Sequence, residues 1–149
     1  MITNILLPTD GSATAKKAVR YAVELAKQTG ATMRLLSVID RSFYTSRSVP
    51  AVATPMRLVE PIEDYLKQVA QACLDDAESL CKKRGVRSKK VIRSGHPVEE
   101  IIKEAERSEA DLVVMGSHGK SAIKAAVLGS VTFGVIHKNT KVPVLVVRR

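Results

Sequence analysis

The segment DLVVMGSHGKSAIKAAVLGSVTFGVI, residues 111 to 136, decides the fold. It opens with a strongly apolar run that is typical of a strand buried on both faces. Three glycines follow within fourteen residues, Gly116, Gly119 and Gly129, with two lysines and two serines between them. Because glycine loses more backbone freedom on folding than any other residue, glycines this close to a core strand indicate a loop that is shaped around something.

Outward from this segment, short apolar runs alternate with helical patterns along the chain. Strands are expected at residues 2–7, 33–39, 89–93, 111–115 and 142–147. Helices with an apolar stripe are expected at about residues 15–29, 61–84, 98–105 and 130–137. This alternation predicts an α/β fold, a three-layer, doubly wound sandwich in which helices cover both faces of a parallel sheet. The length predicts one domain over residues 1–149.

The stretch from Asp40 to Glu60 interrupts this regularity. It holds serines, threonines, arginines and two prolines, and it shows no clear period. We therefore expect a long flexible loop over residues 40–60. The next helix is expected to begin at Pro61, because a proline in the first helical position lacks only an N–H that would have no partner there.

Composition narrows the classes of protein that this chain can belong to. The net charge is +9, and the stretch 82–93 holds seven basic residues and no acidic one. This stretch can be a polyanion-binding surface or a solvated basic edge. With two Phe, three Tyr and no Trp, few aromatic rings can stack on bases, so nucleic acid is not the expected partner.

Membrane, secretion and metal signals are weak. No apolar run approaches the ~20 residues that span a bilayer, and the start MITNILLPTDG lacks the pattern of a signal peptide. We therefore expect a cytoplasmic protein with no membrane contact. Cys73 and Cys81 would lie about 12 Å apart on one helix, too far for a disulfide. No Cys/His cluster has the spacing of a metal site, so no metal-ligating residue is assigned.

Two familiar phosphate motifs can be tested on the glycine segment. A P-loop needs G-x-x-x-x-G-K-[ST], but Val114 stands where its first glycine would precede the GKS at residues 119–121. The dinucleotide fingerprint G-x-G-x-x-G is absent after the first expected strand. What remains is G-x-x-G, nine residues, and then G-S, from Gly116 to Ser130.

This remaining pattern suits a phosphate group. Gly116 and Gly119 allow the backbone to turn its N–H groups inward. Ser130 begins an apolar helix, where free N–H groups and the serine hydroxyl would meet a phosphate, and Thr132 can add a hydroxyl. In parallel sheets, ligands bind at the carboxyl ends of strands where the strand order reverses. If the first and fourth strands are neighbours there, the loops that follow them face one crevice.

The pattern resembles the nucleotide-binding signature of the universal stress protein family. The resemblance covers nearly the whole chain: PTDGS after the first strand, Val38 near the end of the second, VVMGSHGK, LGSV and the final VPVLVV. It implies a five-stranded parallel sheet in the order 3-2-1-4-5. It also implies a nucleotide-dependent regulatory module of the stress response that binds ATP and can act on a further protein partner.

The resemblance also assigns roles to residues. Asp10 corresponds to an acidic residue near the nucleoside and phosphates, and Val38 to the position whose backbone meets adenine. The residues implied to bind nucleotide are Pro8, Thr9, Asp10, Val38, Met115, Gly116, His118, Gly119, Gly129, Ser130, Val131 and Thr132. A Mg²⁺ or Mn²⁺ ion would be held mainly by the phosphates, because no carboxylate pair is near either loop. The apolar last strand, Val142–Val147, would join a homodimer, since an open apolar edge invites pairing.

Alternatives stay open for these residues. Asp10 and Gly11 can form a turn that caps the first helix, Ser130 can be only an N-cap, and the glycines can serve tight packing. Lys120 can be a solvated charge, and His118 an exposed loop residue. Asp10, His118 and Lys120 are the local groups that a slow ATPase could use. We assign no catalytic residue and do not expect efficient turnover.

Overall fold

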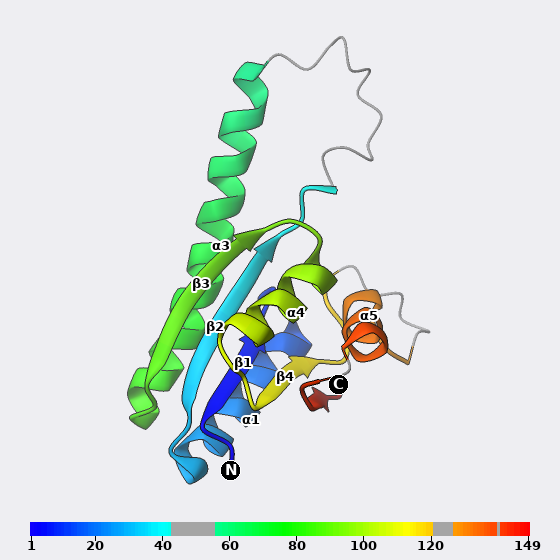
Figure 1. Ribbon diagram of the computed structural model, residues 1–149. Coiled ribbons are helices and arrows are strands. Elements are labelled where there is room, and N and C mark those ends of the chain that lie inside the picture. The colour runs from blue at the N-terminus through cyan, green and yellow to red at the C-terminus, as the bar shows by residue number, and fades with distance from the viewer. Residues whose placement is uncertain (43–55, 121–126, 140) are drawn as a thin grey trace.

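Strands and helices alternate along the chain as expected (Figure 1). The structure is a computed structural model that describes residues 1–42, 56–120, 127–139 and 141–149, with the side chains of 56–60 outside that description. Its elements are β1 (Asn4–Pro8), α1 (Ala13–Thr29), β2 (Thr32–Ile39), α3 (Met56–Arg84), β3 (Ser88–Ser94), α4 (Pro97–Arg107), β4 (Leu112–Gly116), α5 (Ser130–Lys138) and β5 (Val144–Val147).

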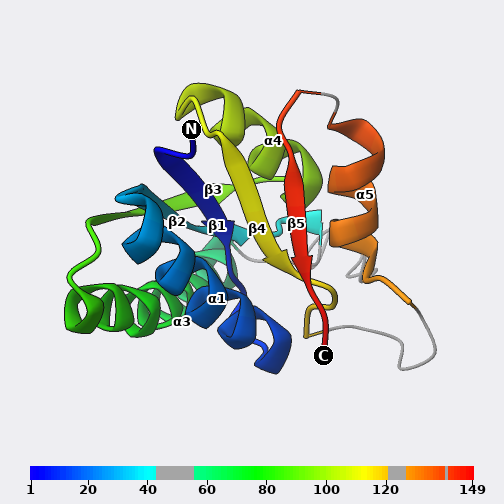
Figure 2. The same cartoon turned by 90° about the horizontal axis from the view of Figure 1, so that it is seen from below.

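The described strands form one parallel sheet in the order β3-β2-β1-β4-β5. This confirms the predicted α/β class and the order 3-2-1-4-5. Helices α1 and α3 cover one face of the sheet and α4 and α5 cover the other, which makes three layers (Figure 2). Because β1 and β4 are neighbours, the order reverses between them.

The central strands serve two hydrophobic cores at once. Ile5 and Leu7 pack under α1 and α3, whereas Leu6 packs under α4 and α5. All three side chains are buried. Successive side chains of a strand point to opposite faces, so a strand covered on both sides must be apolar at every position. This explains why the central strands β1 and β4 are almost wholly apolar, whereas the edge strand β3 carries Lys89, Lys90 and Arg93.

Helix α1 has the boundaries that its flanking residues predict. The Ser12 hydroxyl accepts a hydrogen bond from the Ala15 N–H at 3.2 Å, so Ser12 is the N-cap. Gly30 ends the helix at φ 75°, a left-handed conformation that glycine adopts without steric cost.

Helix α3 begins earlier than the sequence predicts. It starts at Met56, so Pro61 lies inside the helix and does not open it. A proline this near a helix start removes one backbone hydrogen bond, and the rest of the long helix is held by packing against α1, β2 and β3. Residues 56–60 of the predicted 40–60 loop are therefore helical, whereas residues 43–55 lie outside the described residues.

The cysteines behave as expected, and the helices give no membrane signal. Cys73 and Cys81 both lie on α3 as free thiols. Within the described residues, no helix is both long enough and apolar enough to cross a bilayer.

A buried carboxylate joins α4 to the sheet, and the apolar pattern does not reveal it. Glu104 on α4 is fully buried. Its Oε1 lies 2.8 Å from Arg34 Nη1 on β2, and its Oε2 lies 2.8 Å from Arg93 Nε on β3. Burial alone would raise the pKa of Glu104, but the hydrogen bonds from Arg93 and Arg34 outweigh it and lower the pKa. Each carboxylate oxygen of Glu104 therefore has an arginine partner.

We predict that Glu104→Gln lowers the free energy of unfolding by about 2 kcal/mol at neutral pH. Removing one partner of a buried pair costs about 3–5 kcal/mol, and the loss is smaller here because Arg34 and Arg93 keep some water contact. Urea denaturation measures the change. The matched control is Glu106→Gln on the same helix, where an exposed pair with Lys141 is lost and the expected cost is below about 1 kcal/mol. Equal effects of the two substitutions would contradict the prediction.

The lowered pKa of Glu104 also predicts how the stability difference between wild type and Glu104→Gln depends on pH. A carboxyl whose pKa is lowered by folding stabilises the native state above its unfolded pKa, which is about 4.3 for Glu, and loses that contribution as pH falls through the native value. The stability difference between wild type and Glu104→Gln should therefore be full at pH 6 and shrink steadily below about pH 4. Urea titrations at several pH values test this, and a difference that grows on acidification would refute it.

Candidate functional site

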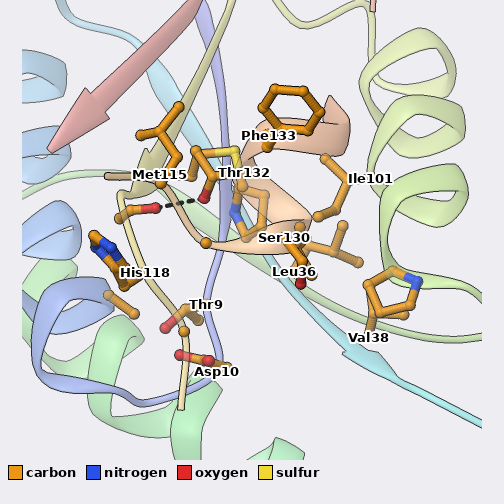
Figure 3. A pocket seen from close by; sticks show the side chains of 18 of the residues that line it. Thr9, Asp10, Leu36, Val38, Ile101, Met115, His118, Ser130, Thr132 and Phe133 are labelled. Atoms are coloured by element: carbon orange, nitrogen blue, oxygen red, sulfur yellow. Dashed lines mark hydrogen bonds between the residues drawn. The ribbon is translucent and has the colours of Figure 1, made fainter. Parts of the chain in front are cut away.

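A pocket of about 530 Å³ opens at the carboxyl ends of β1, β2 and β4 (Figure 3). It lies where the strand order reverses between β1 and β4, the usual place for ligands in open parallel sheets. Its volume falls in the range of small-molecule sites, about 300–1,000 Å³.

The pocket brings together residues that are far apart in the sequence. All twelve residues to which the sequence assigns a binding role line it. Seven further lining residues were not predicted: Ala15, Leu36, Asp40, Pro97, Ile101, Leu128 and Phe133. Leu36 shares the alternation of Val38 along β2, which is the signal that could have found it, and Asp40 follows the end of that strand. Pro97 and Ile101 depend on where α4 packs, which the sequence does not state.

The carboxylate of Asp10 connects the two loops. Its Oδ1 accepts a hydrogen bond from the Ser12 N–H at 2.9 Å, and its Oδ2 accepts one from the Lys120 N–H at 2.9 Å. Asp10 therefore joins the turn after β1 to the loop after β4. The alternative in which Asp10 caps α1 is wrong, because Ser12 fills that role.

The glycines are required by close contacts within the protein. A Cβ on Gly116 would lie 2.9 Å from the Thr14 carbonyl carbon, and one on Gly119 would lie 2.7 Å from Asp10 Oδ2. A Cβ on Gly129 would lie 3.3 Å from the Ser117 carbonyl oxygen, which the Gly129 N–H already contacts at 2.6 Å. These glycines therefore allow the loop after β4 to pack against α1, Asp10 and the start of α5.

The start of α5 presents N–H groups without helical partners. Gly129 is the N-cap and has no side chain to bond to them, so Ser130 is the first helical residue and not the cap. The first backbone bond of the helix is from the Phe133 N–H to the Gly129 carbonyl at 2.9 Å. The N–H groups of Ser130, Val131 and Thr132 precede it and have no hydrogen-bond partner among the described residues. Such donors at a helix N-terminus favour anions.

Two side chains differ from their expected surroundings. Thr132 is buried, and its hydroxyl donates to the Gly116 carbonyl at 2.8 Å, so this hydroxyl ties α5 to β4. His118 is also buried, and the interpretation of His118 as an exposed loop residue is wrong. Its Nδ1 lies 2.8 Å from Ser117 Oγ, and its carbonyl accepts from the Thr14 hydroxyl at 2.7 Å. The sequence missed this because the loop folds back onto α1.

Strand β2 extends past the end of β1 and exposes backbone groups to the pocket. The Thr9 N–H donates to the Leu36 carbonyl at 2.8 Å, so the backbone groups of Leu36 face β1. Backbone direction alternates along a strand, so Val38 faces the same side, where β1 has already ended at Pro8. No described strand covers Val38 on that side, so its N–H and C=O form a donor and acceptor at the pocket.

Charges around the pocket are few. Asp10 and Asp40 line it, and the Lys120 ammonium lies near the turn after β1, where a Cβ on Gly11 would be 3.8 Å from Nζ and 3.3 Å from Cys73 Sγ. Burial raises the pKa of the Cys73 thiol. Among the described residues, no group of three or more His, Cys, Asp or Glu is placed to hold a metal ion.

Comparison with known proteins identifies the family. The model of the universal stress protein family matches residues 1–148. The universal stress protein MJ0577 of Methanocaldococcus jannaschii is 38% identical over 157 aligned positions, which cover 100% of this chain and 96% of MJ0577. A solved structure of MJ0577 superposes with a TM-score of 0.85 at 34% identity, covering 100% of this chain and 97% of the other.

A more distant solved structure shares the fold. It is a universal stress protein in complex with cAMP, with a TM-score of 0.69 and 23% identity over 99% of this chain and 97% of its own. The resemblance inferred from the glycine spacing is therefore confirmed by independent matches over the whole length. The chain belongs to the universal stress protein family.

Proposed function

We propose that this chain is an ATP-binding regulatory module that acts as a homodimer and changes its conformation or choice of protein partner with nucleotide occupancy. The observation that carries the proposal is the division of one pocket into two chemically different ends. One end offers backbone N–H groups to an anion, and the other offers an apolar surface with a backbone donor and acceptor to a base.

The anionic end lies at the start of α5. Ser130, Val131 and Thr132 supply unpaired N–H groups at the positive end of the helix dipole. The loop from Gly116 to Gly119 lies against the same helix start through the bond from the Gly129 N–H to the Ser117 carbonyl. These groups suit the phosphates. By contrast, α4 carries Glu99 and Glu100 in its first turn, which disfavours phosphate there.

The base end lies over β2. Leu36, Val38 and Ile101 provide apolar side chains, which Figure 3 shows at the side of the pocket away from Asp10 and His118. The backbone N–H and C=O of Val38 match the acceptor and donor on the Watson–Crick edge of adenine. The cAMP complex of a protein with this fold supports the idea that such a pocket accommodates an adenine nucleotide.

A divalent ion would be held mostly by the phosphates. Asp10 is the carboxylate near the anionic end, and each of its oxygens already accepts a backbone hydrogen bond. Mg²⁺ commonly binds through one carboxylate plus substrate phosphates and waters, so Asp10 can add at most one ligand. Since Asp10 and His118 are both held by protein contacts, we propose binding as the function and slow hydrolysis as a side activity.

Polyanion binding is less well supported by the basic stretch. Several of its cations are paired with acids from elsewhere in the fold: Lys82 with Glu78, Arg84 with Glu24, and Lys90 with Asp75 and Glu78. Arg93 is paired with Glu104. Cations that are already paired with acidic side chains contribute little to phosphate binding. The positive charge that the stretch 82–93 can offer to a polyanion is therefore smaller than its seven basic residues suggest.

We predict that Ser130→Pro weakens binding of Mg-ATP about tenfold without loss of stability. Proline is favoured at the first helical position, and Gly129 has φ −68° and ψ 158°, which a following proline accepts. The substitution removes one N–H donor to the phosphates, and a hydrogen bond to a charged group contributes about 1.5–3 kcal/mol. Isothermal titration calorimetry of the purified chain measures the dissociation constants.

Ser130→Ala is the matched control for this test. It removes the hydroxyl and keeps the N–H, so binding should weaken by only about threefold. Thermal melts of the free variants show whether α5 is intact. A wild type that binds no nucleotide would refute the proposed function. Unchanged affinity in Ser130→Pro would show that the phosphates do not lie at the start of α5.

The homodimer is proposed from the open edge of the sheet. Strand β5 pairs with β4 on one side, and its other side has no strand among the described residues. The Val113 N–H donates to the Pro143 carbonyl, and the Ser117 N–H donates to the Val147 carbonyl. Because backbone direction alternates, Val144 and Val146 direct their N–H and C=O groups to the open edge. Such an edge pairs readily with a second copy.

We predict that Val146→Pro converts the dimer to a monomer in sedimentation velocity at micromolar concentration. The proline removes an N–H that faces outward and leaves the bonds to β4 in place. Val146→Thr keeps the N–H and should remain dimeric. A dimer that persists in Val146→Pro would place the interface elsewhere.

A further inference from the structure

Asp40 is a carboxylate at the base end of the pocket that the phosphate-binding machinery does not use. It follows β2 directly, lines the pocket and is partly buried. Its Oδ1 accepts hydrogen bonds from the Ser42 N–H at 2.9 Å and the Ser42 hydroxyl at 2.5 Å. Within the described part of the chain, Oδ2 has no hydrogen-bond partner and no cation forms an ion pair with Asp40.

The position of Asp40 follows from the length of β2. This strand continues past Leu36, the last residue paired with β1, and its remaining residues pair only with β3. Leu36 and Val38 are two residues apart in β2 and share one face of the sheet. Asp40 follows Ile39, the last residue of the strand, and lines the same pocket. Leu36 packs in the core under α4 and α5, and Val38 packs against that core. Asp40 therefore lines the base end of the pocket two residues beyond Val38.

A carboxylate in this place discriminates between ligand groups. An ionised carboxylate only accepts hydrogen bonds, so a donor on the ligand is favoured beside it. If the ligand placed an acceptor there, no proton would lie between it and the carboxylate. Both partly buried groups would then lack a hydrogen bond, which costs binding free energy. The polar edge that a purine turns toward β2 carries an amino group at position 6 in adenine and an oxygen there in guanine and hypoxanthine.

We propose that Asp40 makes the pocket selective for purines with a 6-amino group. This inference rests on the proposed function. When the phosphates lie at the start of α5, the base reaches across β1 to β2, two strand spacings or about 10 Å away. One hydrogen of the 6-amino group is then donated to the Val38 carbonyl and the other to Asp40. A 6-oxo group at the same place is repelled by the carboxylate.

Dissociation constants for ATP and inosine triphosphate test the proposal, because the two nucleotides differ only at position 6 and the adjacent ring nitrogen. In the wild type, ATP should bind at least about tenfold more tightly, as expected for a site built to pair with a polar group. In Asp40→Asn, the ratio should fall about threefold or more, because the amide can also donate to a 6-oxo group. The backbone of Val38, which matches the edge of adenine, keeps a remaining preference for ATP. Asparagine still accepts from Ser42, so the turn after β2 is preserved.

The matched control is Asp64→Asn, which makes the same change of charge on an exposed residue of α3. It should leave the ratio at its wild-type value, which separates local recognition from the effect of net charge. A ratio that is unchanged in Asp40→Asn, while the wild type binds ATP, overturns the role of Asp40 and leaves the proposed function intact. A wild type that binds neither nucleotide overturns both.

Discussion

The pocket depends on the bridge that the Asp10 carboxylate makes between two loops. One oxygen bonds to the Ser12 N–H in the turn after β1, and the other bonds to the Lys120 N–H in the loop after β4. These loops are more than a hundred residues apart in the sequence, and they meet because β1 and β4 are neighbours in the sheet. The close approach is possible only because Gly119 has no side chain, since a Cβ there would lie 2.7 Å from Asp10 Oδ2.

The bridge from Asp10 also helps to position the start of α5. With the loop after β4 held against α1, the Ser117 carbonyl receives the Gly129 N–H and positions the start of α5. The buried Thr132 hydroxyl adds a bond to the Gly116 carbonyl from the other side. The helix therefore begins with N–H groups at the pocket that have no partner within the described part of the chain. Each glycine of the motif serves this packing, which brings those N–H groups to the pocket.

The sequence predicts much of the candidate site and misses parts of it for identifiable reasons. The PTDG turn and the spaced glycines were found because turns and close backbone contacts need particular residues at fixed positions. Leu36, Ile101 and Phe133 were missed because an apolar residue in a pocket looks the same as one in a core. His118 was expected at the surface, and its burial depends on how the loop packs on α1. Asp40 was expected only at the start of the 40–60 loop, because its place in the pocket depends on how far β2 extends beyond β1.

Local patterns by themselves determined the class of fold and the family. Alternating apolar strands and helices specify a parallel sheet, because only strands covered on both faces are apolar throughout. The spacing of glycines and hydroxyls between Gly116 and Ser130 indicates the family. Only the tertiary structure decided where α3 begins, how Glu104 is satisfied and which groups face the pocket. These features arise from contacts between residues that are distant in the sequence, and the energies of such contacts depend on packing that no local pattern records.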